Sequence, residues 1–223
     1  MIKRHWKRGV LLACVAWAAL ALPAVAAAKA KKATVDQCVS AAVTIPDGPP
    51  PPFTTANPAA SFAVGVKVPK FKGKRQSGAI TAFHSAGVRI SHTDDSDLAM
   101  FLVSPGGRAV ALATYRDEST NVDDQGRPAP SGDGYGSGAR SCSGSLVRFG
   151  DTFPMSITAP GNKALDAPIT GSFSGEQPLS TFVGGPARGF WTLLVQDVVF
   201  TDVGQINALS LSFTYRYKVN KKG

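Results

Sequence analysis

Histidine and cysteine are scarce in this sequence, with three of each among 223 residues. Two of the histidines, His84 and His92, lie in the body of the chain, and neither is near a Gly-x-Ser-x-Gly pattern. A nucleophilic triad needs a serine or cysteine, a base beside it and an orienting acid. The sequence contains no recognisable triad and predicts a protein that is not an enzyme.

Long apolar runs are also missing. The longest, Gly9 to Leu22, has 14 residues, where roughly 20 are needed to span a bilayer. Basic residues precede it and Pro23 with small residues follows, which is typical of a secretory signal over residues 1–28, cut after Ala26 or Ala28. Lipidation at Cys14 is the alternative. We expect a secreted or cell-envelope-exterior protein with no transmembrane segment after signal removal.

Signal removal takes Cys14 and leaves Cys38 and Cys142 in an oxidising compartment. A single disulfide between these two residues is the natural interpretation. It would join the N-terminal arm to a glycine-rich loop.

Charge is unevenly distributed. The formal net charge is +9, but basic residues concentrate in residues 1–8, in residues 29–75 and after Tyr217, while the body between them is net acidic. We interpret the basic flanks as solvated tails, and the alternative is that they contact an anionic cell wall or membrane surface. Basic and aromatic residues do not interleave, so we expect no nucleic-acid partner.

Helical periodicity is absent after the signal, whereas period-two segments recur and indicate strands. Apolar residues alternate from Leu209 to Tyr217 and from Phe62 to Val68. The segments "DLAMFLV" and "FWTLLVQDVVF" are apolar on both faces, which is typical of central strands in stacked sheets. The pattern predicts an all-β sandwich.

Two stretches lack this pattern. Residues 29–57 are rich in Ala, Lys and Pro and predict an extended, disordered linker. Residues 117–144 are rich in glycine and predict a mobile surface loop. The basic tail is expected over residues 218–223.

Three segments, in order, resemble one known family. "HTDDSDLAMFLVSPGG", "PLSTFVGGPARGFWTLLVQD" and "DVGQINALSLSF" are similar to the signature of the P domain, or Homo B domain, of subtilisin-like proprotein convertases such as kexin and furin. The resemblance spans residues 45–217. It implies a jelly-roll sandwich of about eight strands, related to galactose-binding folds, that follows and stabilises a serine peptidase domain without chemistry of its own.

The sequence departs from the family pattern at three places. Ser96 replaces the usual glycine, Leu209 replaces a tryptophan, and Gly150-Asp151 replaces an acidic pair. Gly150 offers no side chain to a metal site of the kind that relatives have. Residues ahead of position 45 are too few for a peptidase domain, so we expect the companion module without the enzyme.

The stretch from His92 to Asp97 gathers one histidine and three aspartates. Alternation places His92 on the apolar face with Val88 and Ile90, where it would hold the following turn. Aspartates favour turns, and we interpret the whole stretch as a hairpin. The alternative is structural calcium at Asp94, Asp95 and Asp97, although the spacing fits no EF-hand.

Other candidate residues have structural interpretations. Asp97 is expected to accept backbone amides at a strand entrance, and Asp197 and Asp202 to do the same around a later turn. Trp191 is expected in the core. Lys74-Arg75 is a dibasic pair in a polar loop, where cleavage is the alternative.

These observations predict a non-catalytic module that binds or stabilises a protein partner, such as a separately encoded peptidase, or a cell-surface polymer. One alternative is a carbohydrate-binding jelly roll that uses Trp191, Tyr115 or Tyr135. The other is serine endopeptidase activity of the kind that the family carries.

Overall fold

The computed structural model describes residues 28–48, 59–95, 97–114, 134–158, 168–199 and 202–219. Strands dominate these residues, and one short 3-10 helix, η2 (Leu179–Phe182), is present. Within the described ranges, no helix is long and apolar enough to cross a membrane.

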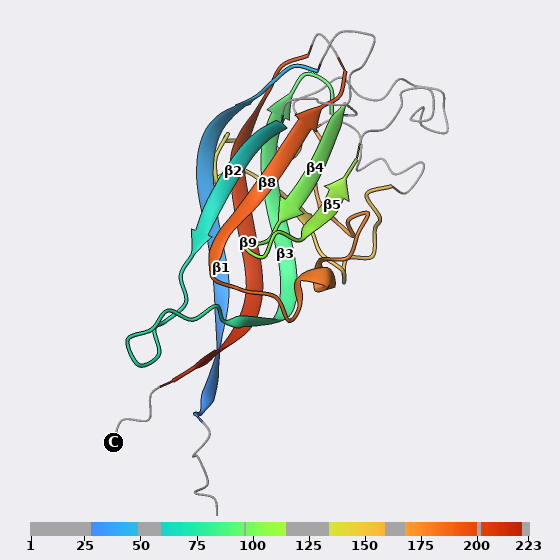
Figure 1. Cartoon of the computed structure of the whole chain (residues 1–223). Helices are drawn as coiled ribbons and strands as arrows, with labels where there is room; N and C mark the ends of the chain where they lie inside the picture. The colour runs from blue at the N-terminus through green and yellow to red at the C-terminus, as the bar shows by residue number, and fades with distance from the viewer. Residues whose placement is uncertain are drawn as a thin grey trace, which may run out of the picture.

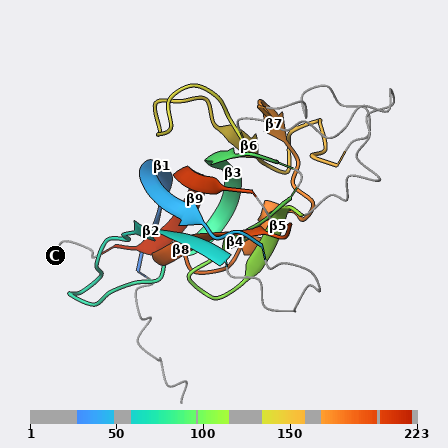
Figure 2. The same ribbon diagram turned by 90° about the horizontal axis from the view of Figure 1, so that it is seen from above.

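Two antiparallel sheets pack face to face, as Figures 1 and 2 show. The five-stranded sheet has the order β1-β9-β3-β6-β7, with the bounds Ala30–Ile45, Gly204–Lys218, Ala79–His92, Val147–Phe149 and Ser172–Phe173. The four-stranded sheet has the order β2-β8-β4-β5, with the bounds Ala59–Val66, Gly189–Asp197, Leu98–Val103 and Ala109–Ala113. One exception to the antiparallel pairing is β7, which is parallel to β6.

This connectivity is that of a jelly roll. Without the two-residue β7, the sheets have the orders β1-β9-β3-β6 and β2-β8-β4-β5. Successive strands then cross from one sheet to the other at every connection except β4 to β5, and the last strand returns to the centre of the first sheet. That arrangement of eight strands in two Greek keys defines the fold. The predicted all-β jelly-roll sandwich is confirmed.

The doubly apolar segments are the central strands, as their composition predicts. β8 and β4 lie between β2 and β5 in the four-stranded sheet. Their inward side chains, which include Trp191, Leu193 and Leu102, are fully buried. The indole ring of Trp191 lies 5.4 Å from the ring of Phe83 and 5.3 Å from that of Phe213, centroid to centroid. The core is therefore aromatic where the two sheets meet.

The prediction of a linker over residues 29–57 is wrong for its first half. Residues 30–45 form β1, which pairs with β9 along its length (Figure 1). Odd-numbered positions of β1 turn toward the sandwich, and five apolar residues among them pack on the core: Ala33, Val35, Val39, Val43 and Ile45. Composition hid this alternation. Residues 49–58 lie outside the described part, and the sandwich begins at Ala30 rather than at residue 45.

The interpretation of residues 88–107 as a hairpin is also wrong. β3 belongs to the five-stranded sheet and β4 to the four-stranded sheet, so the chain passes from one sheet to the other between His92 and Leu98. The tight hairpin lies later, at Ser104 to Gly107, between β4 and β5. There the Gly107 N–H donates to the Ser104 carbonyl at 2.9 Å.

Part of the predicted loop over residues 117–144 is ordered. Residues 115–133 lie outside the described part, but from Gly134 onward the chain packs on β3. The Ile90 N–H donates to the Tyr135 carbonyl at 2.9 Å, and the Tyr135 side chain is buried. Gly134 has a φ of +91°, and a Cβ there would lie 2.0 Å from the Ile90 carbonyl oxygen, which explains the glycine.

Candidate functional site

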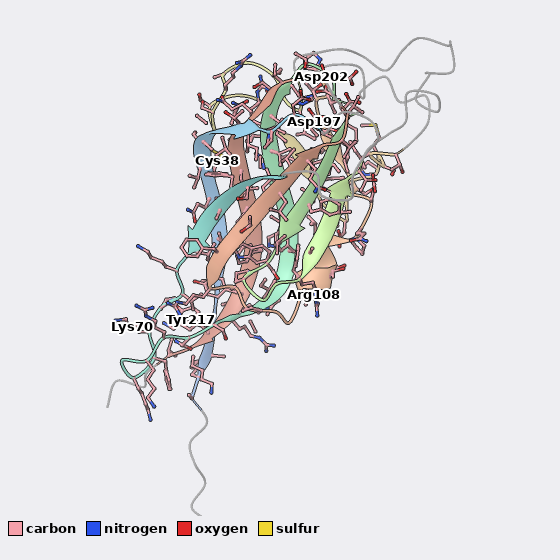
Figure 3. The ribbon with its side chains drawn as sticks, turned by 45° about the horizontal axis from the view of Figure 1, so that its top comes forward. Cys38, Lys70, Arg108, Asp197, Asp202 and Tyr217 are labelled. Atoms are coloured by element: carbon pink, nitrogen blue, oxygen red, sulfur yellow. A yellow bond between two sulfur atoms is a disulfide. The ribbon has the colours of Figure 1, made fainter. Side chains whose placement is uncertain are left out.

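Acidic residues and one histidine meet at one end of the sandwich. β3 ends there at His92, β8 ends at Asp197, and β9 begins just after Asp202. Figure 3 shows Asp197 and Asp202 at this end, opposite the end that carries Lys70 and Tyr217. Residues distant in sequence thus form one polar cluster at this end of the sandwich, where the three strands begin or end.

His92 is the centre of the cluster. Its side chain is buried, and its Nε2 lies 3.2 Å from Oδ2 of Asp197, which is fully buried. Its Nδ1 faces the carbonyl oxygen of Asp94. The Asp94 N–H also lies 3.2 Å from Nδ1. Nδ1 donates to the carbonyl oxygen when it is protonated and accepts from the N–H when it is not, so both ring nitrogens have partners within the protein.

The pKa of His92 follows from this geometry. Burial lowers it, but the hydrogen bond and negative charge of Asp197, with the Asp94 carbonyl, outweigh burial and raise the pKa above 6.5. The imidazolium is the form that two acceptors favour. Asp197 also accepts from the Val199 N–H through Oδ1 at 3.1 Å, which fixes the turn after β8.

Asp97 has the opposite environment. Its side chain is buried, and burial raises its pKa from 3.8 to about 7, assisted by the charge of Asp94 and by a hydrogen bond to Asp202. When Asp97 is protonated, its carboxyl can donate this hydrogen bond to the Asp202 carboxylate. The Asp97 backbone carbonyl meanwhile accepts from the Val198 N–H at 3.0 Å.

Thr93, which the sequence did not single out, links the segment after β3 to the segment before β9. Its hydroxyl donates to Oδ1 of Asp202 at 2.6 Å and accepts from the Val203 N–H at 3.0 Å. Its own N–H donates to the Val203 carbonyl at 3.2 Å. The sequence signal that could have identified Thr93 was its place beside His92 in the segment that resembles the P-domain signature.

The cluster does not have the form of a metal centre in the described residues. No three or more His, Cys, Asp or Glu side chains there are arranged to hold an ion. The structure gathers Asp94, Asp97, Asp197 and Asp202 around His92, while Asp95 is buried next to them. Calcium at Asp94, Asp95 and Asp97 stays a prediction.

Asp151 has a structural partner. Its two oxygens accept from the N–H groups of Leu179 and Ser180, at 2.6 and 2.8 Å, at the start of η2. Gly150 is required before it, because a Cβ there would lie 2.7 Å from the His84 carbonyl oxygen. The departure from the family's acidic pair thus leaves one acid, which caps a turn.

Two of the three aromatic residues suggested as sugar platforms, Trp191 and Tyr135, are buried. Trp191 is fully buried and donates through Nε1 to the Ala187 carbonyl at 3.2 Å, and Tyr135 is 2% exposed. Tyr115 lies outside the described residues. The exposed aromatic is instead Phe190, 70% exposed on β8, which the sequence analysis assigned to a doubly buried strand.

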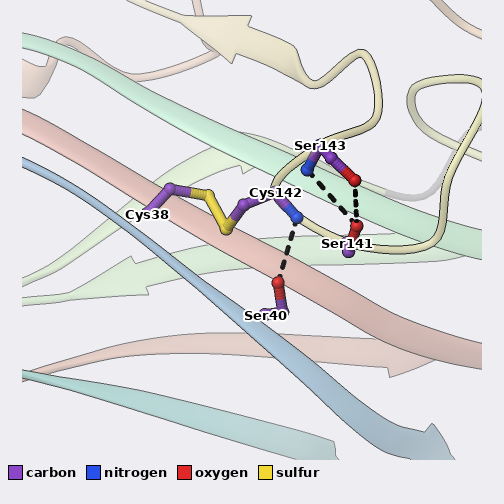
Figure 4. The surroundings of a disulfide bond; sticks show 5 residues. All are labelled: Cys38, Ser40, Ser141, Cys142 and Ser143. Carbon is purple, nitrogen blue, oxygen red and sulfur yellow. Dashed lines mark hydrogen bonds between the residues drawn. A yellow bond between two sulfur atoms is a disulfide. The ribbon is translucent and has the colours of Figure 1, made fainter.

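The disulfide is present (Figure 4). Cys38 on β1 is bonded to Cys142, 104 residues later in the chain. The Cys142 N–H donates to the hydroxyl of Ser40 at 3.0 Å, so the segment after Gly134 is held to the outer side of β1 at two points. The predicted pairing is confirmed.

The other histidine in the described part of the chain, His84, is exposed. Nε2 of His84 lies 2.9 Å from the Thr214 hydroxyl on the outer face of the five-stranded sheet. Lys74 and Arg75 are exposed in the loop between β2 and β3, as a polar loop predicts.

No protein-family model matches the chain, and no curated protein matches it. The fold is similar to part of a serine protease of Aeromonas sobria, with 13% identity and a TM-score of 0.44 over 83% of this chain and 27% of that chain. A complex of Aeromonas sobria serine protease and a chaperone gives 15% identity and a TM-score of 0.45, over 84% of this chain and 27% of that chain. The chain thus spans about a quarter of the length of each, and a likeness at this level carries no functional argument.

Proposed function

We propose that this chain is an exported, non-catalytic jelly-roll module that binds and stabilises a protein partner, with a serine peptidase of the subtilisin class as that partner. The observation that carries the non-catalytic part of the proposal is the burial of His92 between Asp94 and Asp197. A general base must reach the proton that it abstracts. His92 is 4% exposed and both of its ring nitrogens are engaged within the protein.

The residues that carry the family resemblance support the same conclusion. His92, Asp97 and Asp197 join the ends of strands, and Trp191 fills the core. These are roles in maintaining a fold, as expected of an accessory module. The resemblance itself supplies the partner class, since P domains stabilise a serine peptidase.

Activity is tested by labelling the purified protein with a serine-reactive fluorophosphonate and by incubation with casein. We expect neither labelling nor cleavage. Specific labelling of one serine, lost after denaturation, would reject the non-catalytic assignment and favour the endopeptidase alternative.

Partner binding needs a separate experiment. The protein is immobilised, exposed to the secreted fraction of its source cells, and the bound proteins are labelled with fluorophosphonate. We expect one labelled hydrolase whose heat inactivation slows when the module is added back, because a ligand that binds only the native state stabilises it. Heat-denatured module is the control. A labelled hydrolase whose inactivation is unchanged would contradict the stabilising role.

A further inference from the structure

The basic flanks of the chain meet at one end of the sandwich. The first residues of β1 pair with the last residues of β9, and the loop between β2 and β3 lies beside them (Figures 1 and 3). We call the following set the basic end: Lys29, Lys31, Lys32, Lys67, Lys70, Lys72, Lys74, Arg75, Arg216 and Lys218. The segments 29–32, 67–76 and 214–218, which carry it, contain no acidic residue.

The pairing register concentrates like charge. Lys32 lies directly opposite Arg216, and Lys31 opposite Tyr217. Like charges directly opposite in neighbouring strands are destabilising. In the described part of the chain, the ion pair joins His92 and Asp197. No described acidic residue forms an ion pair with Lys31, Lys32, Lys70, Lys74 or Arg216. Fold stability therefore does not account for the basic end.

A specific set of hydrogen bonds holds the loop in place. Nε2 of Gln76 donates to the carbonyl oxygens of Pro69 at 2.8 Å and Lys218 at 3.0 Å. Oε1 of Gln76 accepts from the Lys218 N–H at 2.8 Å. One side chain thus attaches the lysine-rich loop to the end of β9, so the two basic segments present their charges together.

The loop ends in a tight turn with an aromatic residue. Phe71 and Lys74 exchange backbone hydrogen bonds of 3.0 and 2.9 Å, and Lys72 and Gly73 between them have φ values of +47° and +71°. Positive φ at both central residues defines a type I′ turn. The half-buried Phe71 has Lys72 Nζ 5.7 Å from its ring centroid. The tip therefore combines an apolar ring with lysines on both sides.

The arrangement favours a surface over a groove-bound ligand. Lys31 and Lys32 are consecutive in a strand, so their side chains point to opposite faces. Lysines, which act as compact point charges without fixed bidentate geometry, outnumber arginines. The acidic cluster of Asp197 and Asp202 lies at the opposite end (Figure 3). This charge asymmetry would orient the basic end toward a negative surface.

We propose that the basic end binds an anionic lipid surface, with lysines at the headgroups and the tip of the loop at the interface. Each lysine near such a surface strengthens binding about fivefold. The contact would be reversible and weakened by salt. It would hold the module, and any partner bound elsewhere on it, beside a membrane.

The test uses residues 29–223, which contain every described strand and both disulfide cysteines, because residues 1–28 would add their own apolar run. Co-sedimentation is measured with phosphatidylcholine vesicles, with and without phosphatidylglycerol. We expect binding only with the anionic lipid, and a partition coefficient roughly 30-fold lower for the double variant Lys70→Gln/Lys74→Gln. Phe71→Ser should weaken binding without a change of charge.

The matched control is Arg140→Gln/Arg148→Gln, which removes the same charge from exposed positions outside the basic end and should retain binding within about twofold. Circular dichroism and thiol titration check that each variant is folded and oxidised. Equal loss in the two double variants, binding that ignores phosphatidylglycerol, or binding to duplex DNA or polyglutamate but not to vesicles would overturn the proposal.

Discussion

The backbone of Gly204 lies against the imidazole of His92. A Cβ at position 204 would lie 2.1 Å from Cδ2 of that ring and 3.0 Å from the Ser91 carbonyl oxygen. The two residues are register partners at the ends of β3 and β9. The space that holds His92 between Asp94 and Asp197 therefore exists because residue 204 has no side chain.

Gly204→Ala should destabilise the protein by about 2–4 kcal/mol, because the ring and its two hydrogen bonds must move. Urea unfolding measures the change. Gly65→Ala is the matched control, since a Cβ there would lie 3.4 Å from the Phe190 ring, an ordinary contact. Equal effects of the two substitutions would contradict the packing role of Gly204.

The ion pair between His92 and Asp197 should show strong coupling. His92→Gln alone should cost about 3–5 kcal/mol, because it leaves a buried carboxylate without its cation. In a double-mutant cycle with Asp197→Asn, the double variant should lose much less stability than the sum of the losses of the two single variants. Additive losses would show that the two side chains stabilise the fold separately.

Asp97 should make the protein more stable in mild acid than at neutral pH. Its folded pKa of about 7 exceeds the ordinary value of 3.8, so the folded protein holds the proton more tightly. Stability from this group is full below about pH 4 and is lost as pH rises to about 7, an effect on the order of 2 kcal/mol. The raised pKa of His92 acts in the same direction, with stability present below pH 6.5 and lost as pH rises through its folded pKa.

Thermal melts of wild type and Asp97→Asn over this pH range separate the two groups. Asparagine cannot ionise, so the variant should keep only the weaker slope that His92 contributes. Identical pH profiles for the two proteins would rule out Asp97 as the titrating group.

Loss of the disulfide should destabilise the fold without changing its topology. Cys38→Ser/Cys142→Ser opens a closure of 104 residues, for which chain entropy predicts about 4.7 kcal/mol and measured values are commonly 2–4 kcal/mol. Urea unfolding of the variant measures it, with reduced wild type as the control. No free thiol is expected in the denatured, unreduced protein. Two free thiols, or an unchanged unfolding midpoint, would contradict the structural role.

The calcium prediction for Asp94, Asp95 and Asp97 also has a definite outcome. If calcium binds at this alternative site, a chelator would lower the melting temperature and added calcium would restore it, since an ion bound only to the native state stabilises that state. The effect should grow above about pH 7, where Asp97 is ionised. A melting curve that the chelator leaves unchanged at both mildly acidic and alkaline pH would reject the site.

The sequence alone was enough to predict the sandwich, the central strands β4 and β8, and the disulfide. It did not predict β1, because the lysine and alanine content of residues 29–45 concealed the alternation of Val35, Val39 and Val43 with polar residues. It also predicted that residues 88–107 form a hairpin. Short-range signals mark where a chain turns, but they do not tell whether the next strand joins the same sheet.

Alternation of side chains is a local property of a strand, with period two, and so the sequence by itself determined which residues of a recognised strand share a face. Long-range pairing determined everything that links distant positions. Only the fold placed Asp197 beside His92, 105 residues earlier, and Gly204 against the same ring. Only the register of β1 with β9 gathered the two basic flanks into one end of the molecule. Strand partners lie far apart in the chain, and no local pattern encodes which of them will meet.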